Sequence, residues 1–598
     1  MNRWRRVIEQ YRRVGGLMRG QTGKSVLGLL AIMPVQAIAP LLSAGLMKLI
    51  FDSLAHGAGL HDITWFRHEV LLLAAFCGLN LIVAVLNVAN GWLTELQSIR
   101  VTDRVEALIQ AKAVALDLAS FEDPQFHDAL HRAQFEARYR VSEYVGLLAR
   151  LICSFVSAAI LLAFLLRFQP GLVLILAAAL GPGIAVSLRI ASSLNDISLR
   201  DTPLRRQGSY LHLVLCAAEC AKEVRLFGLG RTFQARADAL RARLAASRLR
   251  MARLRSTRDL FTQATWGVAM LGASSWVAWE TVQGAISLGG LVMYVQLLLK
   301  GSEYLKAVQA SLAGLRENSL VLDRLFEFLA FEPRMAAPSQ PVPVTPLETG
   351  LAFEGISFRY PQSDRLALDN VSLWVPAGAK VALVGENGSG KSTLVKLLCR
   401  LYDTGGGRIT WDATDVRDFD PAEMRRHVSV VFQDFVRYHM TARENIWLGN
   451  VDLDLQDPCI EQAAQAAGAE TVVQSLDRQY ETPLGKMLFD GGEDLSQGEW
   501  QRIALARAMV RATPLVVLDE PTSALDAVAE ADFFTRFMHL AGRRTVIFVS
   551  HRFSTVRMAD HIVVMDAGRV IEQGNHADLM ARQGRYAHMF ELQATRYR

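Results

Sequence analysis

Six apolar stretches, each close to the length of a membrane-crossing helix, occupy the N-terminal half of this 598-residue chain. A helix needs about 20 consecutive apolar residues to cross the hydrocarbon core of a bilayer. Apolar residues make up 51% of the chain, and its mean hydropathy is +0.19. The sequence therefore predicts an all-α membrane domain of six spanning helices with long cytosolic extensions, the spans lying at about 25–51, 69–93, 143–168, 171–194, 260–283 and 286–310.

Lysine and arginine are distributed unevenly around these stretches. Seven precede the first stretch, whereas the loop that follows it holds only Arg67. The segments 94–142 and 195–259 are rich in arginine, and the turns at Gln169 and Gly284 hold neither residue type. Because cytosolic loops carry the excess of positive charge, we expect a multi-pass protein with both termini in the cytosol.

The two arginine-rich segments have helical periodicity, which predicts helices that continue well beyond the bilayer. Near the tip of the first, in SFEDPQFHDALHRA, Pro124 is expected to end one helix, and an amphipathic turn follows. Near the tip of the second lies AAECAKEVRLFGLG, around Glu223. Such elements either dock on a soluble partner or form ordinary helical hairpins, and the spacing leaves both interpretations open.

Polar side chains inside the apolar stretches are few. Lys300 and Glu303 lie one turn apart in the last stretch, with Gln296 on the same helix. Since charge is costly inside a bilayer, this set either lines a substrate pathway or holds an i,i+3 ion pair that serves helix packing. Three asparagines share one stripe of the second stretch: Asn80, Asn87 and Asn90. They either line a cavity or bond to neighbouring helices.

Composition argues against two classes of function. The net charge of +5 comes from arginines spread over many short segments, so no basic face for nucleic acid is expected. Six scattered cysteines lack a nearby histidine or a second cysteine pair, which argues against a metal-thiolate site.

A proline-rich segment divides the chain. It reads EPRMAAPSQPVPVTP and predicts a linker over 333–347, after a transmembrane domain over 1–332. Over 348–598, short β-branched runs alternate with helical stretches, which is typical of an α/β domain.

This second half contains VALVGENGSGKST, which has the phosphate-binding pattern GxxxxGK(S/T). Backbone N–H groups of such a loop turn inward on a polyphosphate, the lysine reaches the terminal phosphates, and the serine hydroxyl ligates Mg²⁺. The pattern follows the strand KVALVG and precedes a helix, which is the context it requires. The predicted binding residues are Gly385, Glu386, Asn387, Gly388, Ser389, Gly390, Lys391, Ser392 and Thr393.

Polar residues stand at the ends of three further apolar strands. PLVVLDE ends in Asp519 and Glu520, TVIFVS is followed by His551, and VSVVFQ ends at Gln433. Ligands of open α/β sheets bind at the carboxyl ends of the strands, so we expect these residues to meet there. Asp519 is suited to hold Mg²⁺, partly through water, and Glu520 to take a proton from an attacking water. His551 is suited to contact the terminal phosphate, and Gln433 to orient water or Mg²⁺.

The segment LSQGEWQRIALARA, directly upstream of PLVVLDEPTSALD, resembles the signature motif and Walker B region of ABC transporter ATPases. The order of motifs is also theirs: the aromatic Tyr360, the P-loop, the glutamine loop, the signature, Walker B, a turn ending at Asp526, and the switch histidine. With six apolar stretches ahead of it, the whole chain resembles an ABC exporter half-transporter.

The resemblance implies ATP and Mg²⁺ as cofactors and a site shared by two subunits. It implies that Tyr360 stacks on adenine, that Ser392 and Gln433 meet Mg²⁺, and that Glu520 is the catalytic base. The signature would face the γ-phosphate bound by a partner, through Leu495, Ser496, Gln497, Gly498 and Glu499. It also implies a homodimer, with a heterodimer left open, in a cell membrane such as the bacterial inner membrane, with the ATPase domain in the cytosol.

The signature departs from the family's LSGGQ, with Gln497 for the first glycine and Glu499 for the glutamine. Ser496 and Glu499 form an S-x-x-E pattern, which predicts a capping box at the start of a helix. A carboxylate ~8 Å from a phosphate charge costs roughly 2 kcal/mol at an effective dielectric constant near 20. We therefore expect a working site with altered nucleotide affinity.

The resemblance implies an exporter driven by ATP that moves an amphipathic peptide, lipid or drug by alternating access. FEDPQFHDALHRAQFEA and EVRLFGLG are similar to the membrane halves of lantibiotic-type peptide and multidrug exporters. Two alternatives stay open: uptake by a chain of the same fold, and an ATP-gated channel or sensor without net pumping.

Overall fold

The computed structural model describes residues 23–57, 63–124, 126, 129–130, 133–134, 138–335, 338–486, 490–521 and 527–596. Clustering of contacts divides the chain into two compact units. The helical unit comprises Met1–Val114 and Asp128–Phe331, and the α/β unit comprises Ala115–His127 and Glu332–Arg598.

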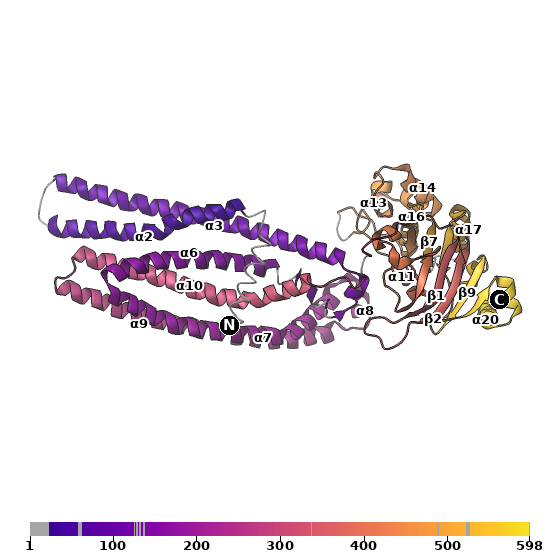
Figure 1. Ribbon diagram of the computed structural model, residues 1–598, viewed down its shortest axis with the longest axis horizontal. Helices are drawn as coiled ribbons and strands as arrows, with labels where there is room; N and C mark the ends of the chain where they lie inside the picture. Colours follow the sequence, from indigo (N-terminus) through magenta and orange to yellow (C-terminus); the bar gives the residue numbers. More distant parts are fainter. Residues whose placement is uncertain are drawn as a thin grey trace. The chain divides into compact units, whose positions relative to one another are not determined.

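Long helices form the helical unit (Figure 1). Their bounds are α2 (Gly23–Gly57), α3 (Ile63–Ala115), α6 (Arg138–Phe168), α7 (Pro170–Cys216), α8 (Ala218–Leu226), α9 (Gly230–Val282) and α10 (Leu288–Leu329). At 1.5 Å per residue, the 53-residue helices α3 and α9 are each about 80 Å long. Since the hydrocarbon core of a bilayer is about 30 Å thick, these helices extend well beyond it, as predicted.

Helix α10 is the centre of this unit, because it packs against α2, α6, α7 and α9. The surrounding core includes the fully buried Trp266, Leu297 and Leu298. Asp52 of α2 secures the first turn of α10. It accepts hydrogen bonds from the Ser287 hydroxyl (3.0 Å) and from the backbone N–H of Gly289 (2.9 Å). A Cβ atom at that glycine would lie 2.2 Å from a carbonyl of α2, so the close approach of the two helices requires glycine.

In the described part of the chain, four helical segments are long and apolar enough to cross a membrane: Ala31–His56, Trp65–Ala115, Arg140–Phe168 and Pro170–Cys216. They match the first four predicted spans. The last two predicted stretches lie in α9 and α10, where serine, threonine, glutamine and charged residues dilute the apolar ones. Both are helices as predicted, but six spans remain a prediction.

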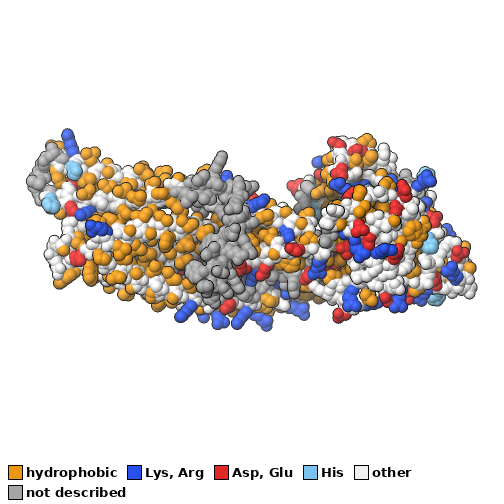
Figure 2. Space-filling model, viewed as in Figure 1, with side chains coloured by type: hydrophobic (Ala, Val, Ile, Leu, Met, Phe, Trp, Pro, Cys, Tyr) orange, Lys and Arg blue, Asp and Glu red, His pale blue; other side chains and the backbone are white. Residues whose placement is uncertain are grey.

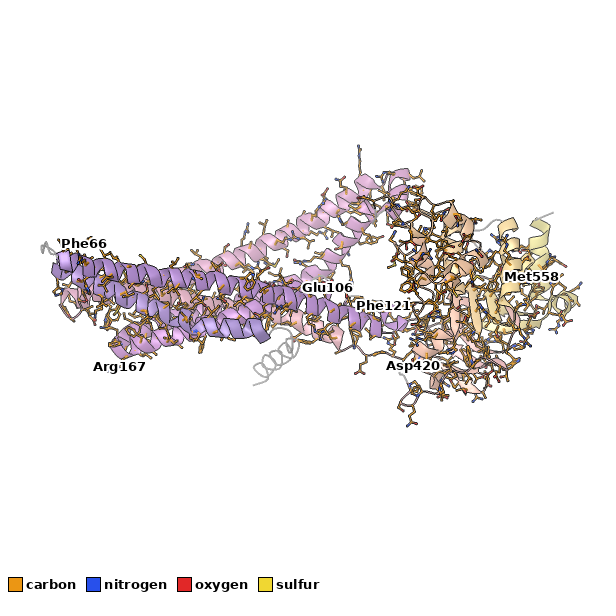
Figure 3. All side chains as sticks on the ribbon, turned by 90° about the horizontal axis from the view of Figure 1, so that it is seen from above. Phe66, Glu106, Phe121, Arg167, Asp420 and Met558 are labelled. Carbon is orange, nitrogen blue, oxygen red and sulfur yellow. The ribbon has the colours of Figure 1, made fainter. Side chains whose placement is uncertain are left out.

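Helix α3 buries little of its apolar surface. Only 6% of its most apolar window is buried within the chain, and Figure 2 shows hydrophobic side chains over much of the visible face of the helical unit. Phe66, at the start of α3, and Arg167, at the end of α6, lie at the same end of this unit (Figure 3). Apolar surface of this extent indicates contact with lipid or with another membrane chain.

The asparagines of the second stretch, Asn80, Asn87 and Asn90, form hydrogen bonds with other groups of the protein. Gln36 of α2 donates to Asn87 (2.9 Å), and Asn90 donates back to Gln36 (3.5 Å). Asn80 donates to the carbonyl of Phe76 in its own helix (2.8 Å). For Asn87 and Asn90 the structure therefore supports the alternative in which the stripe links neighbouring helices.

In the described part of the α/β unit, the strands form a four-stranded and a six-stranded sheet. The smaller is antiparallel, in the order β2 (Leu368–Pro376), β1 (Gly350–Phe358), β4 (Gly406–Trp411), β5 (Thr414–Asp415). The larger has the order β10 (Arg569–Gly574), β9 (His561–Asp566), β3 (Lys380–Val384), β8 (Thr545–Val549), β7 (Leu515–Asp519), β6 (Val428–Val431). Its strands are parallel except for β10, as expected for an α/β domain.

Short helices connect and cover these strands (Figure 1). They are α4 (Leu118–Phe121), α11 (Lys391–Leu398), η2 (Val416–Asp418), α12 (Pro421–Arg426), α13 (Ala442–Trp447), α14 (Pro458–Ala466), α15 (Glu470–Gln474), η3 (Gln479–Glu481), α16 (Gln497–Met509), α17 (Ala527–Ala541), α18 (Phe553–Val556), α19 (His576–Ala581) and α20 (Arg585–Arg596). Strands β7 and β8 are buried along their whole length, as in parallel sheets covered on both faces.

The first predicted tip segment belongs to the α/β unit as far as His127. Helix α3 ends at Ala115, well before Pro124, because Asp117 starts the new helix α4 by accepting from the Ser120 N–H (3.1 Å). Ala119 is buried in a core cluster of the α/β unit, and Glu122 lies 3.8 Å from Lys396 of α11. The segment thus docks on the α/β unit, whereas α8, the second tip segment, has no buried residue.

Candidate nucleotide-binding site

The phosphate-binding pattern forms a loop between β3 and α11, as predicted. Gly385 has a φ angle of +154°, and a Cβ atom there would lie 2.2 Å from the carbonyl oxygen of Met565. Gly390 has a φ angle of +102°, and its Cβ atom would lie 2.8 Å from the carbonyl oxygen of Ala367. Both positions therefore require glycine, for their backbone conformation and for the close approach of neighbouring chain.

Lys391 is folded back onto this loop. Its ammonium donates to the carbonyl oxygens of Gly385 and Glu386 (2.8 Å each) and to the Ser389 hydroxyl (3.2 Å). Burial lowers the pKa of Lys391, while the carboxylates at the ends of β7 oppose this effect. An anion bound in the loop would offset this desolvation and favour the charged ammonium.

The parallel sheet brings the other predicted residues to the same edge. Strand β8 lies between β3 and β7, with Val549 opposite both Leu383 and Asp519, and β6 follows β7. The residues that follow these strand ends meet at Glu520. Gln433 donates to one oxygen of Glu520 (3.0 Å), and His551 Nδ1 lies 3.6 Å from the other.

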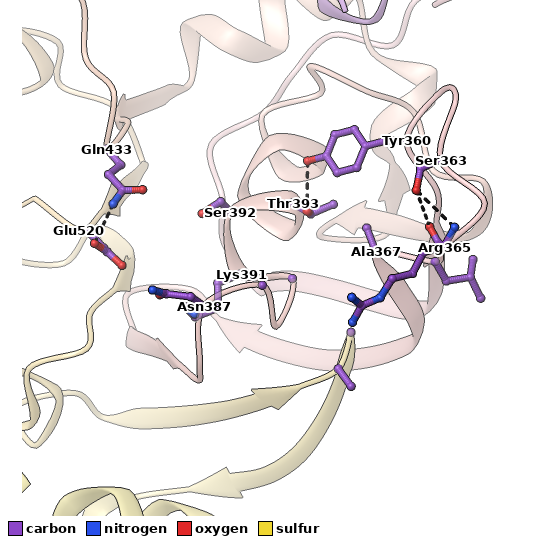
Figure 4. A pocket seen from close by; sticks show the side chains of 15 residues that line it. Tyr360, Ser363, Arg365, Ala367, Asn387, Lys391, Ser392, Thr393, Gln433 and Glu520 are labelled. Carbon is purple, nitrogen blue, oxygen red and sulfur yellow. Dashed lines mark hydrogen bonds between the residues drawn. The ribbon is translucent and has the colours of Figure 1, made fainter. Parts of the chain in front are cut away.

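Glu520 itself has a left-handed backbone, with a φ angle of +49°. Its N–H still bonds to the carbonyl of Val549 in the neighbouring strand (3.1 Å). Positive φ is uncommon outside glycine, and strained positions of this kind are concentrated at functional sites. The conformation directs the Glu520 side chain out of the sheet and toward Gln433 (Figure 4).

Asp519, one residue earlier, is only 4% exposed. Burial raises the pKa of Asp519, although a hydrogen bond with the Ser392 side chain acts in the opposite direction. Its Oδ1 atom is buried and accepts no hydrogen bond from the described residues. A buried carboxylate oxygen beside a serine hydroxyl is the oxygen-only donor set that Mg²⁺ prefers, so these two residues fit that ion.

These residues surround a pocket of about 460 Å³ (Figure 4). Tyr360 stands on one side of it and donates to or accepts from the Thr393 hydroxyl (3.1 Å), while Gln433 and Glu520 lie on the other. The lining comprises Tyr360, Ser363, Arg365, Leu366, Ala367, Asn387, Gly388, Gly390, Lys391, Ser392, Thr393, Gln433, Glu520, Ala567 and Gly568. The pocket thus offers an aromatic ring, which suits a nucleobase, and a phosphate loop, which suits the phosphates of a nucleotide.

Sequence reasoning missed part of this lining. Ser363 and Arg365 lie in the loop just after Tyr360, where a polar, basic stretch next to the aromatic residue was a usable signal. Gly568 lies in the β9–β10 turn, far along the chain, and its N–H donates to the Ser389 carbonyl (3.1 Å). No local pattern marks that turn as part of the site.

The signature segment starts α16, as predicted. Ser496 is the N-cap, its own N–H donates to Glu499 (2.7 Å), and the Glu499 N–H donates to its hydroxyl (3.4 Å). The predicted capping box is thus confirmed. Hydrogen bonds from the Ser496 hydroxyl and the Ser496 backbone N–H lower the pKa of Glu499. The predicted signature residues are absent from the lining of the pocket in the described chain. Asp526 lies outside the described residues.

The residues predicted to line a substrate pathway lie on α10. Lys300 and Glu303 form an ion pair of 2.9 Å, with 47% and 65% of their side chains exposed. Gln296 donates to the Ser43 hydroxyl of α2 (3.4 Å). The contact expected for the packing alternative is therefore present, and the pathway role stays a prediction.

Comparisons with known proteins agree with this geometry. Residues 368–523 match the family model described as ABC transporter. The chain is 28% identical over 485 residues to the subtilin transport ATP-binding protein SpaT of Bacillus subtilis, covering 81% of this chain and 78% of the relative. It is 28% identical over 591 residues to the ATP-dependent lipid A-core flippase of Bordetella pertussis, covering 99% and 91%.

A solved structure has a similar fold over almost the whole chain. It is that of a bacterial Atm1-family ABC exporter with ATP bound, with a TM-score of 0.86 and 24% sequence identity, covering 96% of this chain and 99% of that one. The match includes both the helical unit and the α/β unit. Residues 368–523 therefore form an ABC transporter ATP-binding domain, fused in one polypeptide with a helical membrane domain, and the whole chain has the fold of an ABC exporter.

Proposed function

We propose that the chain is half of an ATP-driven exporter that moves an amphipathic peptide, lipid or drug across a membrane. The observation that carries this proposal is the convergence on Glu520. The phosphate loop, Gln433 and His551 all meet at this carboxylate, in a chain whose other half exposes spanning-length apolar helices. A site of this kind can hydrolyse a nucleotide, and membrane-spanning helices can couple that hydrolysis to the movement of a substrate.

Each residue then has a role in hydrolysis. Tyr360 stacks on adenine, while the loop N–H groups and Lys391 hold the phosphates. Gln433 orients the attacking water, Glu520 takes its proton, and His551 contacts the γ-phosphate. Ser392 and Asp519 hold Mg²⁺, which supplies positive charge to the phosphoryl oxygens.

A second copy of the chain completes the site. The exposed N-terminus of α16, with Ser496 and Gly498, is suited to face a phosphate, because helix N-termini attract anions. Since these residues do not line the pocket of their own chain, we place them against the pocket of the partner. ATP then closes the two ATPase domains head to tail as a homodimer.

Closure is passed to the membrane domain through the docked segment at α4 and through α8. In this proposal all six apolar stretches span the membrane, including those in α9 and α10. Both termini and the ATPase domain lie in the cytosol, and the membrane is a bacterial inner membrane. Gln296, Lys300 and Glu303 line the substrate pathway.

Vesicle transport tests the proposal. Inside-out vesicles that contain the chain should accumulate a fluorescent amphipathic peptide, lipid or drug when ATP is added, and the same compound should stimulate ATP hydrolysis. Vesicles with the Glu520→Gln chain serve as the control and should show neither. ATP-dependent loss of preloaded compound from inside-out vesicles would reassign the chain to uptake, and ion currents without accumulation would reassign it to a channel.

A further inference from the structure

The C-terminal helix α20 contacts both loops that face the terminal phosphates. At its start, Arg585 forms an ion pair with Glu386 of the phosphate loop. Near its end, the Gln593 amide meets the backbone of the switch loop that carries His551. Nothing in the roles assigned above uses this helix.

The side-chain amide of Gln593 both donates and accepts a hydrogen bond. Its Nε2 donates to the carbonyl oxygen of His551 (2.6 Å), and its Oε1 accepts from the N–H of Phe553 (3.0 Å). The two bonds bracket Arg552 and fix the main chain on both sides of it. An apolar side chain would fill the same space without making either bond.

The helix is firmly held where it makes these bonds. Glu572 of β10 accepts from the N–H groups of Arg585 (2.6 Å) and Tyr586 (3.0 Å), which caps the first turn of α20. Tyr586 is fully buried, and its ring packs edge-on against Phe553 with a centroid distance of 5.4 Å. Gln593 is thus placed by a capped helix that the buried Tyr586 anchors.

The ion pair at the other end is a weaker contact. The side chains of Arg585 and Glu386 are 41% and 65% exposed, and exposed pairs contribute little because water screens them. The two bonds of Gln593 join main-chain groups directly to the loop that positions His551. The helix therefore acts on the site chiefly through Gln593.

We propose that Gln593 is a positioning residue, which holds the switch loop so that the His551 imidazole stays beside Glu520. The two side chains are 3.6 Å apart, and His551 is 53% exposed, so packing covers only about half of the side chain. The backbone must therefore help to fix its place. Gln593 constrains that backbone on both sides of Arg552, beside the hydrogen bond from the Arg552 N–H to the Ser550 hydroxyl (3.1 Å). This inference rests on the proposed role of His551 at the γ-phosphate.

The test compares ATP hydrolysis in the full-length chain in lipid for Gln593→Leu and His551→Ala. Gln593→Leu keeps the volume and loses both hydrogen bonds. We expect kcat to fall about tenfold, as for a small misplacement of a catalytic group. The KM for ATP should stay unchanged, and the thermal unfolding midpoint should fall only by the few degrees that two lost hydrogen bonds account for. Gln593→Glu keeps the acceptor for Phe553 but sets a carboxylate against the His551 carbonyl, and should lower kcat as well. Leu592→Ala, at a 56% exposed position of the same helix, is the matched control and should behave as the parent.

A double variant decides whether Gln593 acts through His551. In the His551→Ala chain, Gln593→Leu should cause no further loss of the activity that remains above the Glu520→Gln background. If the losses of activity from the two substitutions multiply in the double variant, the inference is overturned. It is also overturned if Gln593→Leu alone keeps the parental kcat, whether or not its KM for ATP rises. If Gln593→Leu fails to fold, Gln593→Met provides the same comparison. Parental activity in His551→Ala would instead remove the proposed role of His551 itself.

Discussion

Glu520 combines a left-handed backbone with a hydrogen bond from Gln433, and the two features act together. The backbone directs the side chain out of the strand, and the hydrogen bond then fixes one of its oxygens. The second oxygen is left toward His551, at 3.6 Å. A base held in this way has one oxygen positioned and the other available to accept a proton.

Replacing this base should separate binding from hydrolysis. In Glu520→Gln, the amide oxygen still accepts from Gln433, but the side chain no longer accepts a proton from water. We expect ATP turnover to fall by about a hundredfold or more, while nucleotide remains bound in a trapped dimer. Phosphate release and nucleotide retention after gel filtration measure the two effects. Turnover at the parental rate would remove Glu520 from the catalytic role.

Glu499 permits a test of charge alone. In Glu499→Gln, the side-chain oxygen still accepts from the Ser496 N–H, so the capping box is kept. Loss of the carboxylate removes a negative charge near the partner's phosphates, and ATP affinity should rise ~3- to 10-fold once partial solvent screening is allowed for. Titration of ATP at low and high salt checks this, because the gain should shrink as salt increases. Equal affinity at low salt would show that the charge has no effect.

At this scale the sequence predicted local features well. The phosphate loop and the capping box each depend on residues a few positions apart, so their geometry follows from spacing. Gly568 and Gln593 were missed, because each owes its place to a contact with a distant segment. Neither contact leaves a periodic pattern in the chain.

Among the elements, α4 shows how a short helix is held within the α/β unit. Asp117 uses one oxygen to cap α4 through Ser120 and the other to accept the backbone N–H groups of Arg334 and Met335 (3.1 Å for the latter). The segment is thereby joined to the chain that leads into β1. The sequence indicated an amphipathic tip but placed the helix end at Pro124. The cap between Asp117 and Ser120 is local and was a usable signal, whereas the bonds to Arg334 and Met335 depend on distant backbone.

Asp117→Asn should loosen this attachment without uncapping α4. The asparagine oxygen still accepts from Ser120, but its amide faces two N–H donors. Loss of these bonds should lower the free energy of unfolding of the α/β unit by about 1–2 kcal/mol at pH 7. Asp420→Asn is the control, because Asp420 caps α12 through one oxygen only. An equal effect in both variants would assign the loss to capping.

The comparison of the parent with Asp117→Asn also predicts how stability depends on pH. Burial on its own would raise the pKa of Asp117, but hydrogen bonds from Ser120, Met335 and Arg334 lower it. A lowered folded pKa stabilises the protein fully above the unfolded value of about 3.9, and this contribution is lost as the pH falls through the folded value. The difference in unfolding midpoint between parent and Asp117→Asn should therefore shrink below about pH 4. A difference that persists in acid would show that charge is not its source.

Two observations indicate that the folded chain works in contact with lipid or with a second chain. Helix α3 leaves its apolar surface exposed, and the signature residues do not line the pocket of their own chain. The sequence predicted the order of the domains because composition changes sharply at the proline-rich segment. It did not settle the number of spans, because α9 and α10 mix polar residues into their apolar stretches.

Mixed dimers test whether the partner completes the site. Lys391→Ala disables the phosphate loop, and Ser496→Asp keeps a helix cap but sets a negative charge where the partner's phosphate binds. Both homodimers should be inactive. A mixed dimer of the two, isolated through different affinity tags, places both defects in one composite site and leaves the other intact, so it should hydrolyse ATP at about half the parental rate or less. The reciprocal control pairs a parental chain with one that carries both substitutions, which puts one defect in each composite site and should abolish activity. If each chain built its own site, the outcomes would be reversed: the first mixture would be inactive, and the second would keep one working site.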